Sequence, residues 1–240
     1  MCALYLAFAS VDSRGEQFHN LALSYLPSTM QQVINRLPMH TSPQWDATLL
    51  ARIKGYCRGL LLGLATLHDA HWIHRDVSGR NVLLSEDDTV KVCDLGCACR
   101  DDDGLLRCTR IGNQAYRSPE QFFGCPRYGT GVDVWSAALL MAEFGHRKSI
   151  FPGNKTETLP ILTAIEFLGP PPPKYTEKYA NQQVLQILGT RLHKMRVMKR
   201  RKMRHAFSPE FSAFIYSMLR WDPLERPTAR QLLLDSFLHE

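Results

Sequence analysis

His74-Arg75-Asp76-Val77-Ser78-Gly79-Arg80-Asn81 is the stretch of this 240-residue sequence that decides its fold. It lies between a long segment with helical periodicity and two short apolar segments that read as a β-hairpin. Asp94-Leu95-Gly96 follows thirteen residues after Asn81, and Tyr116-Arg117-Ser118-Pro119-Glu120 comes later in the chain. Each motif alone carries little information, but the three together, in this order and context, form a specific pattern.

The residue types in these motifs suit phosphoryl transfer, which needs an oriented hydroxyl group and a neutralised triphosphate. Asp76 is the candidate general base that accepts the proton of a substrate hydroxyl. Asn81 and Asp94 offer oxygen ligands, which suit Mg²⁺ because hard cations prefer oxygen. A lone aspartate in a loop more often caps backbone groups, so the argument for Asp76 depends on its two companions.

The three motifs resemble, in order, the catalytic loop (residues 74–81), the metal-binding triplet (94–96) and the end of the activation segment (116–120) of eukaryotic protein kinases. The activation segment as a whole would cover residues 94–120. The resemblance implies an α+β, protein-kinase-like fold, mainly the helical C-lobe with a remnant of the N-lobe sheet. It also implies ATP and Mg²⁺ as cofactors and a serine/threonine kinase that acts on protein substrates. The corresponding domain division is a partial N-lobe with the hinge over 1–27 and a C-lobe over 28–240.

Further features resemble the CMGC group of kinases, and glycogen synthase kinase-3 in particular. They are Tyr116-Arg117, Phe151-Pro152-Gly153, the hinge-like stretch Asn20 to Pro27 and an inserted region near 170–205. This likeness implies a proline-directed kinase or one that needs an acidic or already phosphorylated substrate.

The same resemblance assigns nucleotide-binding roles. Leu23 would be the gatekeeper, and Ser24 and Leu26 would hydrogen-bond adenine through their backbone. Leu83 would form the floor of the adenine pocket, with an ordinary core leucine as the alternative. Cys93, which directly precedes the metal-binding triplet, completes the predicted set.

Departures from the family pattern leave a pseudokinase or interaction scaffold open as the alternative function. No Gly-rich loop, strand lysine or partner-helix glutamate precedes Leu4, so the chain is expected to begin at the fourth strand of the small lobe. Ser78 stands where the family has a lysine that steadies the transferring phosphate. Arg80 is the candidate replacement, because a guanidinium group binds phosphate well. Arg110 stands where glycogen synthase kinase-3 has its phosphorylated tyrosine.

Other side chains are predicted to support the structure rather than the chemistry. Glu120 and Arg226 stand where kinases place a buried ion pair that anchors the activation segment. Asp133 stands where kinases hold the backbone of the catalytic loop. Arg75 is expected to face the activation segment, where binding of an anion and a plain ion pair are both open.

Charge and cysteine content limit the remaining classes of function. The net charge is +6, and a dense basic run between Lys194 and Arg204 reads as a solvated surface or as a docking site for an acidic partner. No aromatic-rich recognition motif accompanies the run, so nucleic acid is not an expected partner, whereas a regulatory protein partner stays open. Seven cysteines, without a signal peptide or an apolar stretch of membrane-spanning length, predict free thiols, no membrane partner and a cytoplasmic and/or nuclear location.

The hydrophobic pattern predicts a few strands followed mostly by helices. Leu4 to Ala9 and Leu21 to Leu26 read as two short buried strands of one hairpin. Asp46 is the predicted N-cap of the strongest helix. The other predicted elements are a hairpin of Asn81 to Leu84 with Val90 to Cys93, and helices at Ser28 to Asn35, Ala47 to Leu67, Asp133 to Phe144, Thr158 to Leu168, Ser208 to Leu219 and Ala229 to Leu234.

Overall fold

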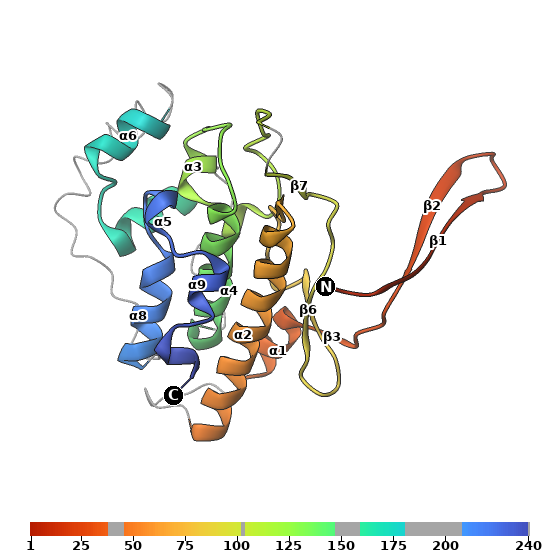
Figure 1. Cartoon of the computed structure of the whole chain (residues 1–240), viewed down its shortest axis with the longest axis horizontal. Coiled ribbons are helices and arrows are strands. Elements are labelled where there is room, and N and C mark those ends of the chain that lie inside the picture. The colour runs from red at the N-terminus through yellow and green to blue at the C-terminus, as the bar shows by residue number, and fades with distance from the viewer. Residues whose placement is uncertain (38–45, 102–103, 147–158, 181–207, 240) are drawn as a thin grey trace.

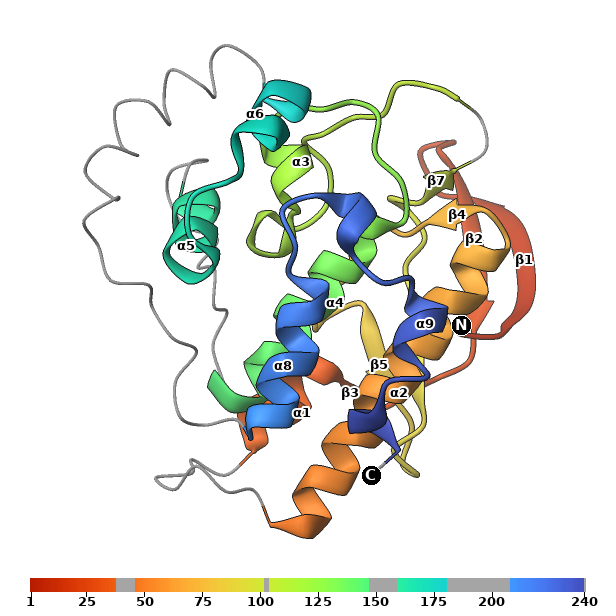
Figure 2. The ribbon, with the colours of Figure 1, turned by 60° about the vertical axis from the view of Figure 1, so that its left-hand side comes forward.

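The computed structural model describes residues 1–37, 46–101, 104–146, 159–180 and 208–239, and its elements follow the expected order of strands and then helices. The strands are β1 (Leu4–Val11), β2 (Gln17–Leu23), β3 (Ser28–Thr29), β4 (Trp72–Ile73), β5 (Val82–Leu84), β6 (Val90–Val92) and β7 (Cys99–Arg100). The helices are α1 (Met30–Arg36), α2 (Ala47–Asp69), α3 (Pro119–Phe122), α4 (Gly131–His146), α5 (Leu159–Leu168), α6 (Pro173–Tyr179), α8 (Pro209–Met218) and α9 (Ala229–Leu232). The helices gather into one body, beside which β5 and β6 lie (Figures 1 and 2). The predicted α+β class is therefore confirmed.

Helix α2 forms because apolar side chains recur along it every three or four residues. Its buried face includes Leu49, Ile53, Leu60 and Leu64. The helix starts at the predicted N-cap Asp46, whose Oδ1 accepts a 2.8 Å hydrogen bond from the backbone N–H of Leu49. The long helix thereby turns one continuous apolar face toward the core.

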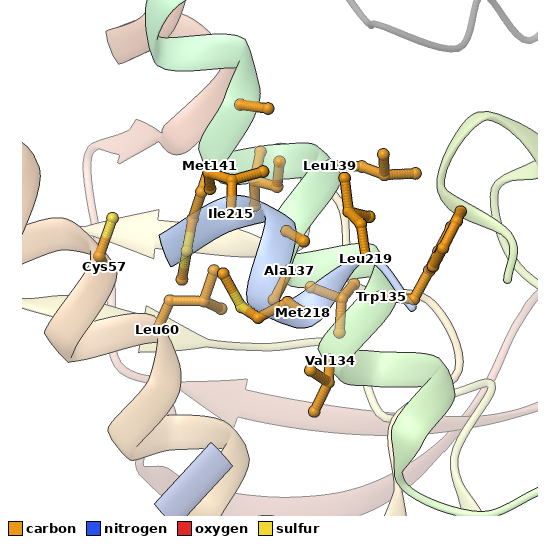
Figure 3. Close-up of a cluster of buried hydrophobic side chains, with 14 of the residues drawn as sticks. Cys57, Leu60, Val134, Trp135, Ala137, Leu139, Met141, Ile215, Met218 and Leu219 are labelled. Carbon is orange, nitrogen blue, oxygen red and sulfur yellow. The ribbon is translucent and has the colours of Figure 1, made fainter. Parts of the chain in front are cut away.

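Helix α4 is the centre of the hydrophobic core. Its residues are buried without interruption from Val132 to Phe144, as expected for a helix that is apolar all round. Side chains from α2, α4 and α8, among them Leu60, Ala137 and Met218, gather into one cluster (Figure 3). The start of this buried stretch, which includes Asp133, is therefore held firmly enough to position a site.

The strands of the described residues form small antiparallel sheets with the pairings β1–β2, β3–β5–β6 and β4–β7. In the β5–β6 hairpin, Val82 pairs with Val92 and Leu84 with Val90. The hairpin lies directly on α2, and a Cβ atom added to Gly59 would stand only 2.7 Å from the Cβ of Val90. The glycine therefore sets how closely the hairpin approaches the helix.

The β1–β2 hairpin is exposed, so the prediction of two buried strands is wrong in this respect. Leu4, Leu6, Phe8 and Leu21 are each 50% to 63% exposed, and the hairpin extends away from the helices (Figure 1). The second strand also covers Gln17–Leu23 rather than the predicted 21–26. The apolar pattern identified the strands, but such a pattern does not tell whether another part of the chain covers them.

The other predicted elements agree with the structure to within two residues at each end. The structure adds short elements that were not predicted, namely β3, β4, β7, α3 and α6. Strand β3 precedes α1, and its Thr29 forms a capping box with Gln32. None of the helices in the described ranges combines the length and apolarity that a membrane crossing needs. Phe151-Pro152-Gly153, most of the predicted insert near 170–205 and the basic run from Lys194 to Arg204 lie outside the described residues.

Candidate active site

The catalytic loop is held by the buried carboxylate of Asp133 at the start of α4. Its Oδ2 accepts a hydrogen bond from the backbone N–H of His74 and its Oδ1 accepts one from that of Arg75, both 2.8 Å long. The Nε2 atom of His68 lies 2.9 Å from Oδ2. The predicted role of Asp133 as the holder of this loop is therefore confirmed.

The backbone of two site residues adopts the left-handed region, which non-glycine residues rarely enter. Arg75 has a φ of 66° and Asp94 a φ of 61°. The Arg75 guanidinium contacts the activation segment as expected, donating to the carbonyl of Cys97 at 2.6 Å. It also lies 3.4 Å from the hydroxyl of Tyr128. These partners of Arg75 are neutral, so the structure shows no ion pair at this side chain within the described residues. Anion binding by Arg75 stays a prediction.

The Asp76 carboxylate is oriented by two donors, one on each of its oxygens. Its Oδ2 accepts a 2.8 Å hydrogen bond from Asn81 Nδ2, which also donates to the Asp76 carbonyl at 2.9 Å. Its Oδ1 accepts a 2.7 Å hydrogen bond from the backbone N–H of Asn113. The predicted base thus has a fixed orientation between the catalytic loop and the activation segment.

Asp94 is carried next to Asn81 by the β5–β6 hairpin. The Cys93 N–H donates to the Asn81 carbonyl at 2.9 Å, which extends the pairing of the two strands by one residue. His74 joins this hairpin to the catalytic loop: its Nδ1 accepts from the N–H of Asp76 at 3.2 Å, so its Nε2 carries the proton and donates to the Cys93 carbonyl at 2.9 Å. His74 is fully buried, and both of its ring nitrogens are hydrogen-bonded.

The chemistry of the oxygen atoms that Asn81 and Asp94 offer suits a magnesium ion. Because Asn81 Nδ2 is engaged by Asp76, the amide oxygen Oδ1 is the Asn81 atom that remains for a cation. Asp94 is exposed, and its Oδ1 accepts one 3.1 Å hydrogen bond from the Gly96 N–H. Among the described residues no group of three or more His, Cys, Asp or Glu side chains could hold a metal. One amide and one carboxylate oxygen suit Mg²⁺, which usually combines few protein ligands with phosphate oxygens.

The predicted nucleotide-binding residues fall into two groups. Cys93, Asp94 and the half-buried Leu83 belong to the β5–β6 hairpin and its continuation. Leu23 and Ser24 lie at the base of the β1–β2 hairpin, where Leu23 is 46% exposed and the N–H of Ser24 donates to the Ala3 carbonyl at 2.8 Å. The half-buried Leu26 follows them. Their roles toward adenine stay predictions.

A polar cavity of about 260 Å³ opens beside the catalytic loop, and sequence reasoning missed most of it. It is lined by Gln31, Ser78, Gly79, Arg80, Asn113, Ala115, Tyr116 and Glu143. The Tyr116 hydroxyl donates to Glu143 Oε1 at 2.7 Å, and burial together with this carboxylate raises the pKa of Tyr116. Ser78 is buried, whereas Arg80 is exposed. The sequence signal that could have pointed to this cavity was Glu143, an acidic residue within the apolar run from Ala137 to Phe144 of α4.

The end of the activation segment is tied to the core by the predicted buried ion pair. Both Arg226 terminal nitrogens lie 2.7 Å from the Glu120 carboxylate, one on each oxygen, and both side chains are fully buried. The guanidinium group also stacks on the Trp135 ring at 5.1 Å from its centroid. This prediction is confirmed.

Comparison with known proteins agrees with this geometry. The family model described as "Protein kinase domain" matches residues 14–238. Mitogen-activated protein kinase 9 of Arabidopsis thaliana is 32% identical over 188 residues, which cover 75% of this chain and 36% of that protein. Mitogen-activated protein kinase mpkC of Aspergillus oryzae is 31% identical over 179 residues, covering 75% and 51%. The chain thus spans about a third to a half of the length of these curated relatives. It belongs to the protein kinase domain family.

Proposed function

We propose that this chain is the catalytic lobe of a CMGC-group protein kinase that transfers the γ-phosphoryl group of ATP to serine or threonine side chains of proteins. The observation that carries the proposal is the fixed orientation of Asp76 between Asn81 Nδ2 and the Asn113 N–H, with Asp94 beside Asn81. The Ser/Thr class is supported by relatives whose names are those of mitogen-activated protein kinases.

Each side chain has a distinct task in this reaction. Asp76 accepts the proton of the substrate hydroxyl as that oxygen attacks. Asn81 Oδ1 and the Asp94 carboxylate would hold Mg²⁺, which neutralises charge on the phosphate oxygens when bound. Arg80, exposed at the cavity next to the loop, would steady the transferring phosphate in the place of the family lysine, since Ser78 carries no charge and is buried.

The proposal includes the narrower likeness to glycogen synthase kinase-3, which concerns two regions of the chain: the hinge and the activation segment. Leu23, Ser24, Leu26 and Leu83 would surround adenine as in that family. The proposed enzyme would not need tyrosine phosphorylation at the position of Arg110, because an arginine there cannot be phosphorylated by a tyrosine kinase. The scaffold alternative gains no support from the relatives, which are named as kinases.

The substitution Asp76→Asn tests the proposal, because it keeps the size of the side chain and removes its basicity. We expect the rate of γ-phosphate transfer to a protein substrate to fall about 10²- to 10⁴-fold, the usual contribution of a general base. Asp69→Asn is the matched control, since Asp69 is an exposed residue that pairs with Arg230 away from the site. Circular dichroism and a melting curve check that both variants fold. A full transfer rate in Asp76→Asn would contradict the assignment of the base.

A further inference from the structure

Strand β1 pairs with β2 on one side, and its other edge has no partner strand among the described residues. The turn of the hairpin shows which backbone groups face that free edge. The N–H of Asp12 donates to the Glu16 carbonyl at 3.0 Å, so these two residues form a hydrogen-bonded pair at the end of the hairpin. Hydrogen-bonded and non-hydrogen-bonded pairs alternate along an antiparallel ladder. The even-numbered residues from 6 to 10 therefore bond to β2, while the N–H and C=O groups of Ala7 and Ala9 point to the free edge.

The free edge of β1 lacks the features by which proteins commonly protect edge strands, namely charged side chains, proline and a covering helix or loop. Residues 1–11 and 17–26 contain no Asp, Glu, Lys, Arg or Pro. The strand has one irregularity in its register, between Leu4 and Leu6 at its base. The hairpin extends away from the helices (Figure 1), so the edge is open along its length to another strand.

Charge and symmetry point to a second copy of this chain as the partner. An edge without charged residues offers nothing that selects an acidic or a basic partner. Two copies with a net charge of +6 each repel one another, and this repulsion is weakest where the chain carries no charge. A lone two-stranded hairpin is at best marginally stable in water, whereas a sheet of three or more strands is favoured. A second copy would complete a four-stranded sheet, related by the two-fold symmetry that is commonest among homodimers.

We propose that two copies of this chain form a dimer in which β1 pairs antiparallel with β1 of the second copy, with the two Phe8 residues opposite each other. Backbone groups that point to the free edge must meet groups that do the same. Ala7 of one copy therefore exchanges hydrogen bonds with Ala9 of the second copy.

The side chains favour this register over its neighbours. It places Phe8 opposite Phe8 and Tyr5 opposite Val11, and aromatic–aromatic and aromatic–β-branched pairs stabilise antiparallel strands. Tyr5 and Val11 are 73% and 61% exposed in the single chain, so both have surface to bury. A dimer centred on Ala7 would place Tyr5 opposite Ala9, and one centred on Ala9 would place Phe8 opposite a serine, so both lose these pairs.

Proline substitutions on opposite edges of the hairpin test which edge forms the dimer. Ala7 pairs with Leu21 across the hairpin, and neither N–H takes part in the bonds between β1 and β2. Ala7→Pro thus removes a donor from the free edge of β1, and Leu21→Pro removes one from the outer edge of β2, while the hairpin ladder stays intact. In sedimentation velocity of the 240-residue chain we expect the parent and Leu21→Pro to be dimers and Ala7→Pro to be a monomer. A monomeric parent, or a dimer that survives Ala7→Pro, would overturn the proposal.

Introduced cysteines test the register. The background carries Cys2→Ser and Cys108→Ser, which remove the thiol next to β1 and the exposed thiol. In the proposed dimer, residue 7 of one copy lies opposite residue 9 of the other at a Cα separation of about 5.5 Å, which a disulfide spans. Identical positions of the two copies lie on a diagonal, about 7–8 Å apart, which is beyond the usual span of a disulfide.

After mixing, equilibration and oxidation with copper phenanthroline, we expect Ala7→Cys together with Ala9→Cys to give a disulfide-linked dimer, and neither variant to do so alone. Cleavage before aspartate and mass analysis should locate the cross-link between two copies of peptide 1–11. Cross-linking of Ala7→Cys alone would mean a dimer centred on Ala7, and that of Ala9→Cys alone one centred on Ala9. Either result would refute the register, and a mixture without any cross-link in this peptide would refute the pairing of the β1 strands.

Discussion

Asp133 links the stability of the protein to pH, because its ionised form holds the backbone of the catalytic loop. Burial raises the pKa of this carboxyl group, but hydrogen bonds and charge interactions with His68 and His74 outweigh burial and keep the pKa below its ordinary value of 3.8. A carboxyl group with a lowered pKa in the folded state adds stability above its unfolded pKa. That stability is lost as the pH falls through the folded pKa.

We therefore expect Asp133→Asn to remove part of the acid sensitivity. At neutral pH the variant should be less stable by about 1–3 kcal/mol, since buried N–H groups lose a charged acceptor. Between about pH 5 and 3 its free energy of unfolding should fall less than that of the wild type. Urea unfolding at a series of pH values measures both quantities. An unchanged acid slope would show that another group is responsible.

Gly112 allows the activation segment to approach the catalytic loop. Its φ is 69°, and a Cβ atom added there would lie 2.2 Å from the carbonyl oxygen of Arg75. We expect Gly112→Ala to displace the neighbouring Asn113 N–H from Asp76 and to lower the rate of phosphoryl transfer, in addition to a backbone cost of about 1–2 kcal/mol.

The matched control for this substitution is Gly104→Ala. Gly104 has a similar φ of 63° but no atom within 4 Å of an added Cβ. It should lose a similar amount of stability from backbone strain, yet keep its activity. Equal activity losses in the two variants, measured as transfer rates beside melting temperatures, would contradict the importance of the close approach.

The residues of the site differ in how far the sequence revealed them. Asp76, Asn81 and Asp94 were predictable because their spacing within two short motifs is specific. Gly112 and Glu143 were not, because their contacts with Arg75 and Tyr116 arise only when the chain brings distant segments together. No local pattern encodes such long-range contacts.

At the level of elements, the contact between α2 and the β5–β6 hairpin determines where Asn81 and Asp94 stand. We expect Gly59→Ala to push the hairpin away from the helix, since the new Cβ would lie 2.7 Å from the Cβ of Val90. Stability should fall by about 1–3 kcal/mol, as is typical of overpacking, and Mg²⁺-dependent nucleotide binding should weaken.

Gly55 provides the control within the same helix. No atom lies within 4 Å of a Cβ added to Gly55, so Gly55→Ala should raise stability by about 1 kcal/mol through helix propensity alone. Chemical denaturation of both variants gives the comparison. A Gly59→Ala protein as stable as the Gly55→Ala protein would show that the hairpin can shift without cost.

Helices were predicted well because their signals are local. The N-cap Asp46 and the apolar periodicity of α2 act within a few residues, and they set the start of the helix correctly. The burial of β1 and β2 was predicted wrongly because it depends on which other strands or helices cover them. Strand identity is a local property, whereas strand burial is a property of the whole assembly.

On the scale of the whole molecule, the β1–β2 hairpin offers apolar side chains and unpaired strand edges to the solvent. We expect the 240-residue chain by itself to self-associate, because Leu6 and Phe8, 56% and 50% exposed, gain from burial. The double substitution Leu6→Lys with Phe8→Lys should shift sedimentation profiles toward the monomer. The control Leu234→Lys changes an exposed residue in the turn that follows α9, and it should leave the sedimentation profile unchanged. A parent chain that stays monomeric at high concentration would contradict the prediction.

The left-handed backbone at Arg75 and Asp94 has a consequence for laboratory evolution of this protein. Glycine at either position would relieve about 1–2 kcal/mol of strain, so a library selected only for heat resistance would drift toward glycine there. The same substitutions would remove the hydrogen bond from the Arg75 guanidinium to the Cys97 carbonyl, and the proposed magnesium ligand Asp94. Selection for heat resistance therefore favours glycine at positions 75 and 94, whereas selection for catalytic rate favours the present Arg75 and Asp94. A screen must measure both properties.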